Sequence, residues 1–327
     1  MANPEHINII KKGVTLWNKW RSENNEIRPD LSNVDLRNED LHGVNLEKTD
    51  LSGTDFRGAD LSGANLYSAK LNLTNLQEAD LYEVQADNAV FDGANLSSAQ
   101  LKYGRFEYST FVKADMKNTY SEKAYFYGAN LSGANLSESY LALANLCDTN
   151  FIQSIALNAD FKGSNLNGAI LVNSDFSNSD LSNLAIANAK LSVSKFLNVD
   201  FRYSSLVNTD LSKADITGSK LYGSARDDWE INNIRCEYIF WDRNGTNRSP
   251  KNRSFMPGEF ESLYQRLPTF EYIFEQGCTP LDTIILDKSI QTINEQNPEL
   301  NLHLESLNFR GKAKAVFNVI HEEYIDE

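Results

Sequence analysis

The feature that most constrains this chain is a repeat of five residues, seen clearly in GTDFRGADLSGANL, residues 53–66. An α-helix returns a side chain to the same face about every 3.6 residues, and a strand does so every 2. Neither period keeps Phe56, Leu61 and Leu66 on one buried side. The backbone must follow another geometry, because a fixed period outranks local propensity in deciding the fold.

The repeat keeps its register from Leu31 to Leu221, and a large apolar residue stands at every fifth position except Ala86, Ser121 and Ala156. A small or β-branched residue commonly stands two positions earlier, with Asp or Asn between the two. This pattern resembles the pentapeptide-repeat family over roughly residues 29–223. The resemblance implies a right-handed quadrilateral β-helix, in which each pentad forms one side of a square and four pentads close a coil.

In such a coil the large apolar residue and the small residue before it point inward, and the other three positions face solvent. Each residue stacks on the residue 20 positions later, about 4.8 Å away, as adjacent strands do. The surface then has four faces, which we name after their first apolar residues: the Leu31, Leu36, Leu41 and Leu46 faces. Because the interior is filled, any function of the array is expected on these faces.

Both ends of the array are expected to carry caps, because an open coil exposes strand edges and core. We predict an N-terminal helical cap over residues 1–28, with one helix from 4 to 22 that begins after Asn3. Its apolar side would cover the first coil. A membrane-surface helix is the alternative, but the mixed charge of this segment favours a cap. The apolar residues recur at helical spacing: Ile7, Ile10, Val14, Trp17 and Trp20.

The five-residue period ends after Leu221, and we predict a small C-terminal α+β domain over residues 224–327. Its expected elements are a strand at 236–242, an exposed loop at 243–253, a helical stretch from 257, a helix from 279, and a strand at 300–304 before a hairpin turn at 310–312. The region resembles those that follow pentapeptide arrays in other bacterial proteins, particularly cyanobacterial ones, and this resemblance implies no activity. The loop has no acid and four bases, which permit head-to-tail self-association with the acidic first coils: Arg243, Arg248, Lys251 and Arg253.

Residue patterns of catalysis and cofactor binding are not found. The four histidines (His6, His42, His303 and His321) lie far apart, and the three cysteines show no disulfide or metal-ligand spacing. No glycine-rich phosphate loop or nucleophile motif is present. We therefore predict a protein that is not an enzyme and uses no cofactor or metal. The N-terminus lacks the apolar core of a signal peptide and no stretch approaches about 18 apolar residues, so we expect a cytoplasmic protein without membrane association.

Acidic residues concentrate in the first coils. There are thirteen acidic and four basic residues between Asp30 and Asp92, whereas there are eleven of each between Gly93 and Leu221. Family members that protect bacterial DNA gyrase are understood to imitate DNA with such carboxylates, so the resemblance implies mimicry towards a type II topoisomerase as one possible function. A solvated surface is the alternative, and with a net charge of −14 no direct nucleic acid binding is expected. Five acids gather on the Leu41 face, and we call them the acidic stripe: Glu39, Asp40, Asp60, Asp80 and Glu83.

All ten tyrosines of the array occupy outward positions of the adjacent Leu41 and Leu46 faces. Exposed tyrosine is favoured at protein interfaces, so we predict a contact surface for a protein partner or a second copy. Stacking along the coils and cover by the C-terminal domain are alternatives. The predicted function is a non-enzymatic interaction scaffold; a DNA-mimicking gyrase inhibitor and a ligand-sensing or enzymatic C-terminal domain are the other candidates. We call six residues the tyrosine patch: Tyr103, Tyr108, Tyr120, Tyr125, Tyr127 and Tyr140.

Overall fold

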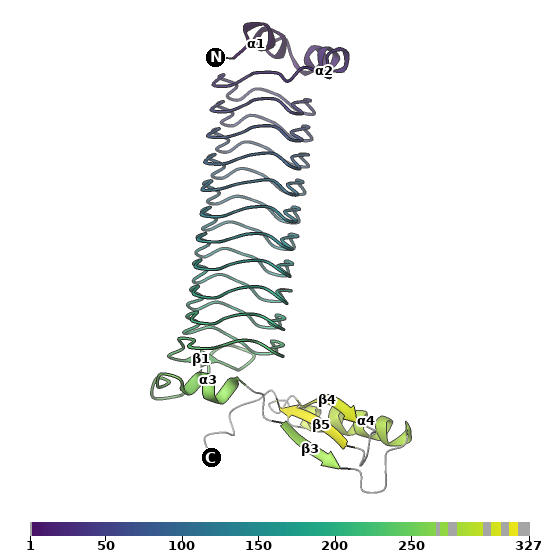
Figure 1. Cartoon of the computed structure of the whole chain (residues 1–327), viewed down its shortest axis with the longest axis vertical. Helices are drawn as coiled ribbons and strands as arrows, with labels where there is room; N and C mark the ends of the chain where they lie inside the picture. Colours follow the sequence, from purple (N-terminus) through teal and green to yellow (C-terminus); the bar gives the residue numbers. More distant parts are fainter. Residues whose placement is uncertain (1, 266–268, 274–279, 297–301, 309–313, 320–327) are drawn as a thin grey trace. The chain divides into compact units, whose positions relative to one another are not determined.

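The computed structural model describes residues 2–265, 269–273, 280–296, 302–308 and 314–319. The chain divides into two compact units, Met1–Gly258 and Glu259–Glu327. The first unit begins with helices α1 (Pro4–Ile10) and α2 (Val14–Glu23) and continues as a stack of coils (Figure 1). It ends with strands β1 (Ile239–Phe240) and β2 (Arg248–Ser249), which pair antiparallel.

The coils have the predicted repeat of 20 residues. The residue before each large apolar residue forms a parallel bridge with the residue 20 positions later, from Asp30↔Asp50 to Lys220↔Phe240. The amide of Leu61, for example, donates to the carbonyl of Asp80 at 2.7 Å. Leu61 is fully buried, as is nearly every residue at its position. The array is therefore a β-helix with four pentads in each coil.

The interior of the β-helix is a ladder of stacked side chains. The ring of Phe91 stacks on that of Phe111 at 4.6 Å, one coil away. In the later coils serine often takes the small inward position in place of alanine. Several of these hydroxyls donate to a backbone carbonyl of the previous coil or of their own coil: Ser204 Oγ to Leu181 O at 2.6 Å and Ser139 Oγ to Leu136 O at 2.5 Å. A buried hydroxyl without such a partner would be destabilising.

The N-terminal cap consists of two helices, whereas the sequence predicted one helix over residues 4–22. The break falls at Gly13, whose φ of 104° lies in a region that other residues rarely adopt. The predicted helix start is confirmed, because the Asn3 side chain accepts a hydrogen bond from the amide of Glu5 at 2.9 Å.

Side chains of α2 complete the open edge of the first coil. Trp17 Nε1 donates to Asn45 O at 2.7 Å, and Asn18 both donates to Gly43 O and accepts from Asn45 N, at 2.9 and 2.8 Å. Arg21 donates to Glu47 O at 3.1 Å. Helix α2 therefore covers the first coil through specific hydrogen bonds to strand-edge groups as well as through apolar contact.

At the other end, the coil geometry continues past residue 223, where the sequence predicted that the array ends. The bridges Ser205↔Ala225, Asp210↔Glu230 and Asp215↔Arg235 keep the 20-residue register. The pattern is hidden in the sequence because Arg226 occupies an inward position. This arginine is buried because its guanidinium lies over the rings of Trp241 and Trp229, 4.4 and 5.5 Å from their centroids.

The second unit contains α3 (Glu259–Tyr264), β3 (Thr269–Ile273), α4 (Pro280–Gln296), β4 (Leu302–Asn308) and β5 (Lys314–Val319). The strands form an antiparallel sheet in the order β3-β5-β4. The predicted helix from residue 279 and strand near residue 302 are present. The helical stretch expected from 257 is only α3, because the β-branched and aromatic residues of TFEYI form β3 instead. The predicted turn at 310–312 lies outside the described residues.

Candidate functional site

The aspartates of the acidic stripe have a local structural role. A side-chain oxygen of Asp60 accepts the amide of Ser62 at 2.9 Å, and Asp40 and Asp80 accept the amides of His42 and Tyr82 at 3.2 and 2.9 Å. Such bonds close the turn at each corner of the coil. This role explains why Asp and Asn dominate this position throughout the array, and it uses only part of the acceptor capacity of each carboxylate.

The bridges Asp40↔Asp60 and Asp60↔Asp80 place three carboxylates of the stripe in one column. Glu39 and Glu83 lie on the same face and are exposed. Within the part of the chain that the structure describes, none of the five forms an ion pair. The hydroxyl of Ser62 donates to Asp60 and lowers the pKa of that carboxyl below its ordinary value. Among the described residues, no Lys or Arg side chain therefore pairs with the carboxylates of the stripe.

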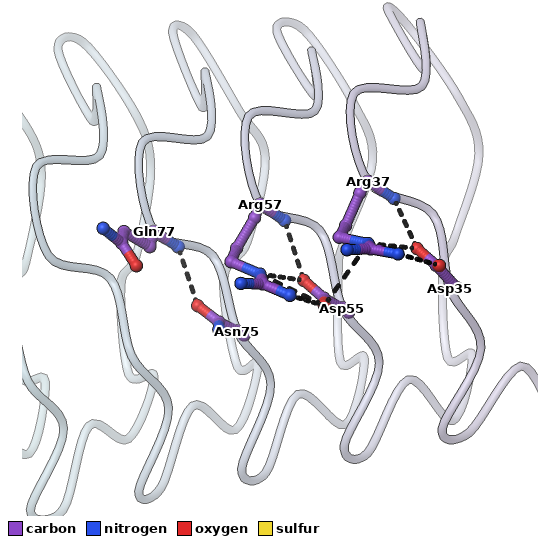
Figure 2. A network of polar contacts seen from close by, with 6 residues as sticks. All are labelled: Asp35, Arg37, Asp55, Arg57, Asn75 and Gln77. Atoms are coloured by element: carbon purple, nitrogen blue, oxygen red, sulfur yellow. Dashed lines mark hydrogen bonds and ion pairs between the residues drawn. The ribbon is translucent and has the colours of Figure 1, made fainter.

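The neighbouring Leu36 face shows the contrasting arrangement (Figure 2). Arg37 pairs with Asp35 at 2.6 Å, and Arg57 pairs with Asp55 at 2.7 Å. A side-chain hydrogen bond from Arg57 lowers the pKa of the Asp55 carboxyl. Asp35 and Asp55 are therefore paired with arginine, whereas the five carboxylates of the acidic stripe form no ion pair among the described residues.

The structure brings the tyrosines together in pairs. Tyr120 stacks on Tyr140 with ring centroids 5.2 Å apart, and Tyr108 meets Tyr127 edge-on at 5.4 Å. Tyr103 does not pair within the patch; it meets Tyr82 of the preceding coil at 5.7 Å. The sixth member, Tyr125, is 45 % exposed. The patch thus consists of distinct small groups on two adjacent faces.

Three patch residues stand where the coil itself gains from Asp or Asn. Tyr120, Tyr125 and Tyr140 occupy the bridge position, and a phenol cannot close the turn as a carboxylate or amide does. In the described array, the amides two residues later therefore donate no hydrogen bond to protein. Tyr103 and Tyr108 adopt φ values of 60° and 57°, a region unfavourable for bulky side chains. Backbone geometry therefore gives no reason for tyrosine at these five positions.

The acidic stripe and the tyrosines are physically connected. A hydrogen bond to Glu83 raises the pKa of Tyr82, and the ring of Tyr82 contacts Tyr103. Two ammonium groups lie near Tyr103: Lys102 Nζ and Lys123 Nζ are 5.6 and 5.5 Å from the ring centroid. The Leu41 face therefore passes from carboxylates, through an aromatic cluster with two cations, to the Tyr120–Tyr140 stack.

One exposed apolar residue near the patch was missed by the sequence analysis. Leu143 belongs to the same pentad as Tyr140 and is 58 % exposed. The sequence does mark this residue, because leucine at a solvent-facing position departs from the repeat pattern. Leu143 enlarges the apolar surface of the Leu41 face beyond the tyrosines.

The basic loop is folded against itself. Arg248 Nη1 donates to Pro250 O at 2.7 Å and to Arg253 O at 2.6 Å, and its guanidinium lies 4.4 Å from the ring centroid of Tyr238. Asp242 accepts the amides of Thr246 and Asn247 at 2.9 and 2.8 Å. The hydrogen-bonding groups of Arg248 are therefore used within the loop. This weakens the sequence-based prediction that the loop binds the acidic coils of another copy.

The histidines of the first unit make separate local contacts. His6 Nδ1 accepts a hydrogen bond from the Asp30 amide at 3.1 Å, and His42 Nδ1 lies 2.8 Å from the Ser62 hydroxyl. Over the described ranges, no group of His, Cys, Asp and Glu side chains is suited to hold a metal ion. The helices in these ranges include none that is both long and apolar enough to cross a membrane.

Comparisons with known proteins address the family. A search of curated proteins finds no match. Among solved structures, the chain is similar to HetL, a pentapeptide repeat protein involved in heterocyst differentiation regulation from the cyanobacterium Nostoc sp. strain PCC 7120. The identity is 19 %, 68 % of this chain and 96 % of HetL are covered, and the TM-score is 0.46. Rfr23 from the cyanobacterium Cyanothece 51142 is 22 % identical over 28 % of this chain and 64 % of Rfr23, with a TM-score of 0.28.

QnrB1, a plasmid-mediated fluoroquinolone resistance protein, is 18 % identical over 65 % of this chain and 92 % of its own, with a TM-score of 0.22. The family model for pentapeptide repeats matches in eight copies, at residues 30–63, 40–77, 59–97, 79–118, 124–156, 144–183, 157–192 and 194–225. Because these matches cover more than half of the sequence, the chain belongs to the pentapeptide-repeat family.

Proposed function

We propose that this protein is a non-enzymatic scaffold that binds another protein through the Leu41 and Leu46 faces of its β-helix. The observation that supports this best is the placement of the tyrosine patch. Its rings stand partly exposed, and three occupy the bridge position that Asp or Asn would serve better. Exposed tyrosine offers rigid apolar area with a polar tip, which protein interfaces use.

Stabilisation of the coils is the competing explanation, and its magnitude can be compared. An aromatic pair such as Tyr120–Tyr140 contributes about 0.5–1.5 kcal/mol beyond its buried area. Two turn-closing hydrogen bonds, which Asn at both positions would make, contribute about 0.5–1.5 kcal/mol each. The two hydrogen bonds together contribute about 1–3 kcal/mol, which equals or exceeds the contribution of the aromatic pair, so ring pairing gives no reason for tyrosine at these positions.

Affinity capture with matched variants tests the proposal. The tyrosine variant combines Tyr120→Asn, Tyr125→Asn and Tyr140→Asn. Each Asn places a turn-closing acceptor at the bridge position. The control variant replaces exposed apolar residues of the other two faces, by Leu73→Asn, Ile155→Asn and Val193→Asn. A partner captured from the native cell extract by wild type and control, but lost from the tyrosine variant, supports the proposal. Equal capture by all three proteins refutes it.

DNA mimicry towards gyrase is the second candidate, and the unpaired acidic stripe is the observation that favours it. The arginine-paired acids of the Leu36 face speak against it, because Asp35 and Asp55 then add no unpaired charge to the first coils. A supercoiling assay separates the two candidates. Inhibition or protection of gyrase that is lost when the stripe aspartates are changed to Asn would favour mimicry over the scaffold.

A further inference from the structure

The acidic stripe and the tyrosine patch share one column of the Leu41 face. Consecutive bridges join Asp40, Asp60, Asp80, Gln100, Tyr120 and Tyr140 in this order. Five steps of about 4.8 Å make this column about 24 Å long. One end carries carboxylates that form no ion pair among the described residues, and the other carries a stacked aromatic pair, with exposed Leu143 in the same pentad as Tyr140. A single elongated partner segment could therefore contact both halves.

The spacing of the column favours a helix over an extended strand. Side chains on one side of a helix recur about every 5.4 Å, one turn, whereas those on one side of a strand recur about every 6.8 Å. The helical repeat is closer to the step of about 4.8 Å between rungs. A helix of about 16 residues has the length of the column.

The charges along the same column disfavour a second copy of this chain as the occupant. Beyond Tyr140 the column continues through Asp160 and Asp180. Two copies laid side by side in parallel would place each stripe against the other stripe. An antiparallel pair centred on the Tyr120–Tyr140 stack would place Asp80 opposite Asp180. Both orientations bring carboxylates together, which costs affinity.

We infer that the Leu41 face binds a cationic amphipathic helix of another protein, with Lys or Arg along the acidic stripe and bulky apolar residues against Tyr120 and Tyr140. The inference rests on the proposed function and names its partner. The carboxylates attract and orient the helix, and the tyrosine end supplies the buried contact. The Asn-for-Asp exchange leaves the turn acceptor in place, so the charge of the stripe can be tested without opening the coil.

The test measures binding of two synthetic peptides, each about 18 residues long, to the full chain by fluorescence anisotropy at low and high salt. The first peptide carries Lys on one side of its first half and Leu and Trp on the same side of its second half. The second has the same composition with Lys and the apolar residues on opposite sides. The stripe variant is Asp40→Asn, Asp60→Asn and Asp80→Asn. The matched control removes the same charge from the Leu31 face, by Asp30→Asn, Asp50→Asn and Asp92→Asn.

We expect wild type and control to bind the first peptide in preference to the second. The stripe variant should bind about tenfold more weakly and with less salt dependence. Tyr120→Asn with Tyr140→Asn should weaken binding at both salt concentrations. Equal binding of the two peptides, equal weakening by stripe and control variants, or no binding overturns the inference. If the inference fails in this way but affinity capture still finds a tyrosine-dependent partner, the proposed scaffold function stands without the helix inference. A salt-sensitive dimer in sedimentation that the tyrosine change abolishes would identify a second copy as the occupant and also overturn the inference.

Discussion

Tyr125→Asn is predicted to leave the β-helix as stable as wild type or more stable. Tyr125 stands at a bridge position of the Leu46 face, in the column Arg105↔Tyr125↔Asn145. One coil later, Asn145 accepts the amide of Cys147 at 3.3 Å, whereas in the described array the amide of Tyr127 has no protein acceptor. Asparagine at 125 can close the turn in the same way.

The expected change follows from two opposing effects. The new hydrogen bond contributes about 0.5–1.5 kcal/mol. Loss of the tyrosine removes a residue favoured in strands, an effect of up to about 1 kcal/mol. Because the ring is 45 % exposed, little further apolar burial is lost. The free energy of unfolding should therefore stay the same or rise by up to about 1 kcal/mol.

Guanidinium unfolding of the full chain measures this change from the midpoint at an unchanged slope. The reverse substitution is the control. Asn130 accepts both the amide and the hydroxyl of Ser132, at 3.1 and 2.5 Å, so Asn130→Tyr should destabilise by about 1–3 kcal/mol. A loss above about 1 kcal/mol for Tyr125→Asn would refute the reasoning, because it would show that Tyr125 stabilises the coils.

Three further results are expected. Asn18→Leu removes two hydrogen bonds to the first coil edge and should speed hydrogen exchange of the Asn45 amide while later coils keep their protection; unchanged exchange would show that the cap does not depend on Asn18. Arg226→Ala removes the guanidinium that lies over Trp229 and Trp241 and should destabilise by about 2–4 kcal/mol with a change in tryptophan fluorescence; a variant as stable as wild type would show that this contact does not stabilise the last coils. The pKa values of Asp55 and Asp60 lie below those of the unfolded chain, so their stabilisation is present above about pH 4 and is lost as the pH falls through the folded pKa. The melting temperature should thus fall below about pH 4, less steeply in Asp60→Asn, and an identical profile for wild type and variant would exclude this contribution.

The period of five was sufficient to predict the array, because every coil uses the same inward positions and each pentad repeats the evidence. Even Ala86, Ser121 and Ala156 keep the register and are fully buried. The end of the array could not be predicted in this way. Arg226 stands where the repeat expects a large apolar residue, so the sequence indicates that the array has ended. The burial of Arg226 depends on its contacts with Trp229 and Trp241, which no periodicity reveals.

The candidate site was predictable as a set of faces but not as a set of contacts. Counting in twenties places Asp40 and Tyr140 on the same face. It does not show that the carboxylates of Asp35 and Asp55 are paired with arginine while those of the acidic stripe are not. Nor does it show that Tyr103 pairs with Tyr82 outside the patch. The orientation of each side chain at the corners of the coil decides these pairings, and the repeat pattern does not specify that orientation.

Site-specific photo-cross-linking tests the central claim most directly. A photoreactive phenylalanine analogue would replace Tyr125 on the Leu46 face or, as the control, Ile155, which is similarly exposed on the Leu36 face. The two proteins would be irradiated in the cells that naturally express the chain. The account predicts a discrete protein adduct at 125 and none at 155. Adducts of the same proteins at both positions, or none at either, would contradict the claim that the tyrosine faces bind a protein partner.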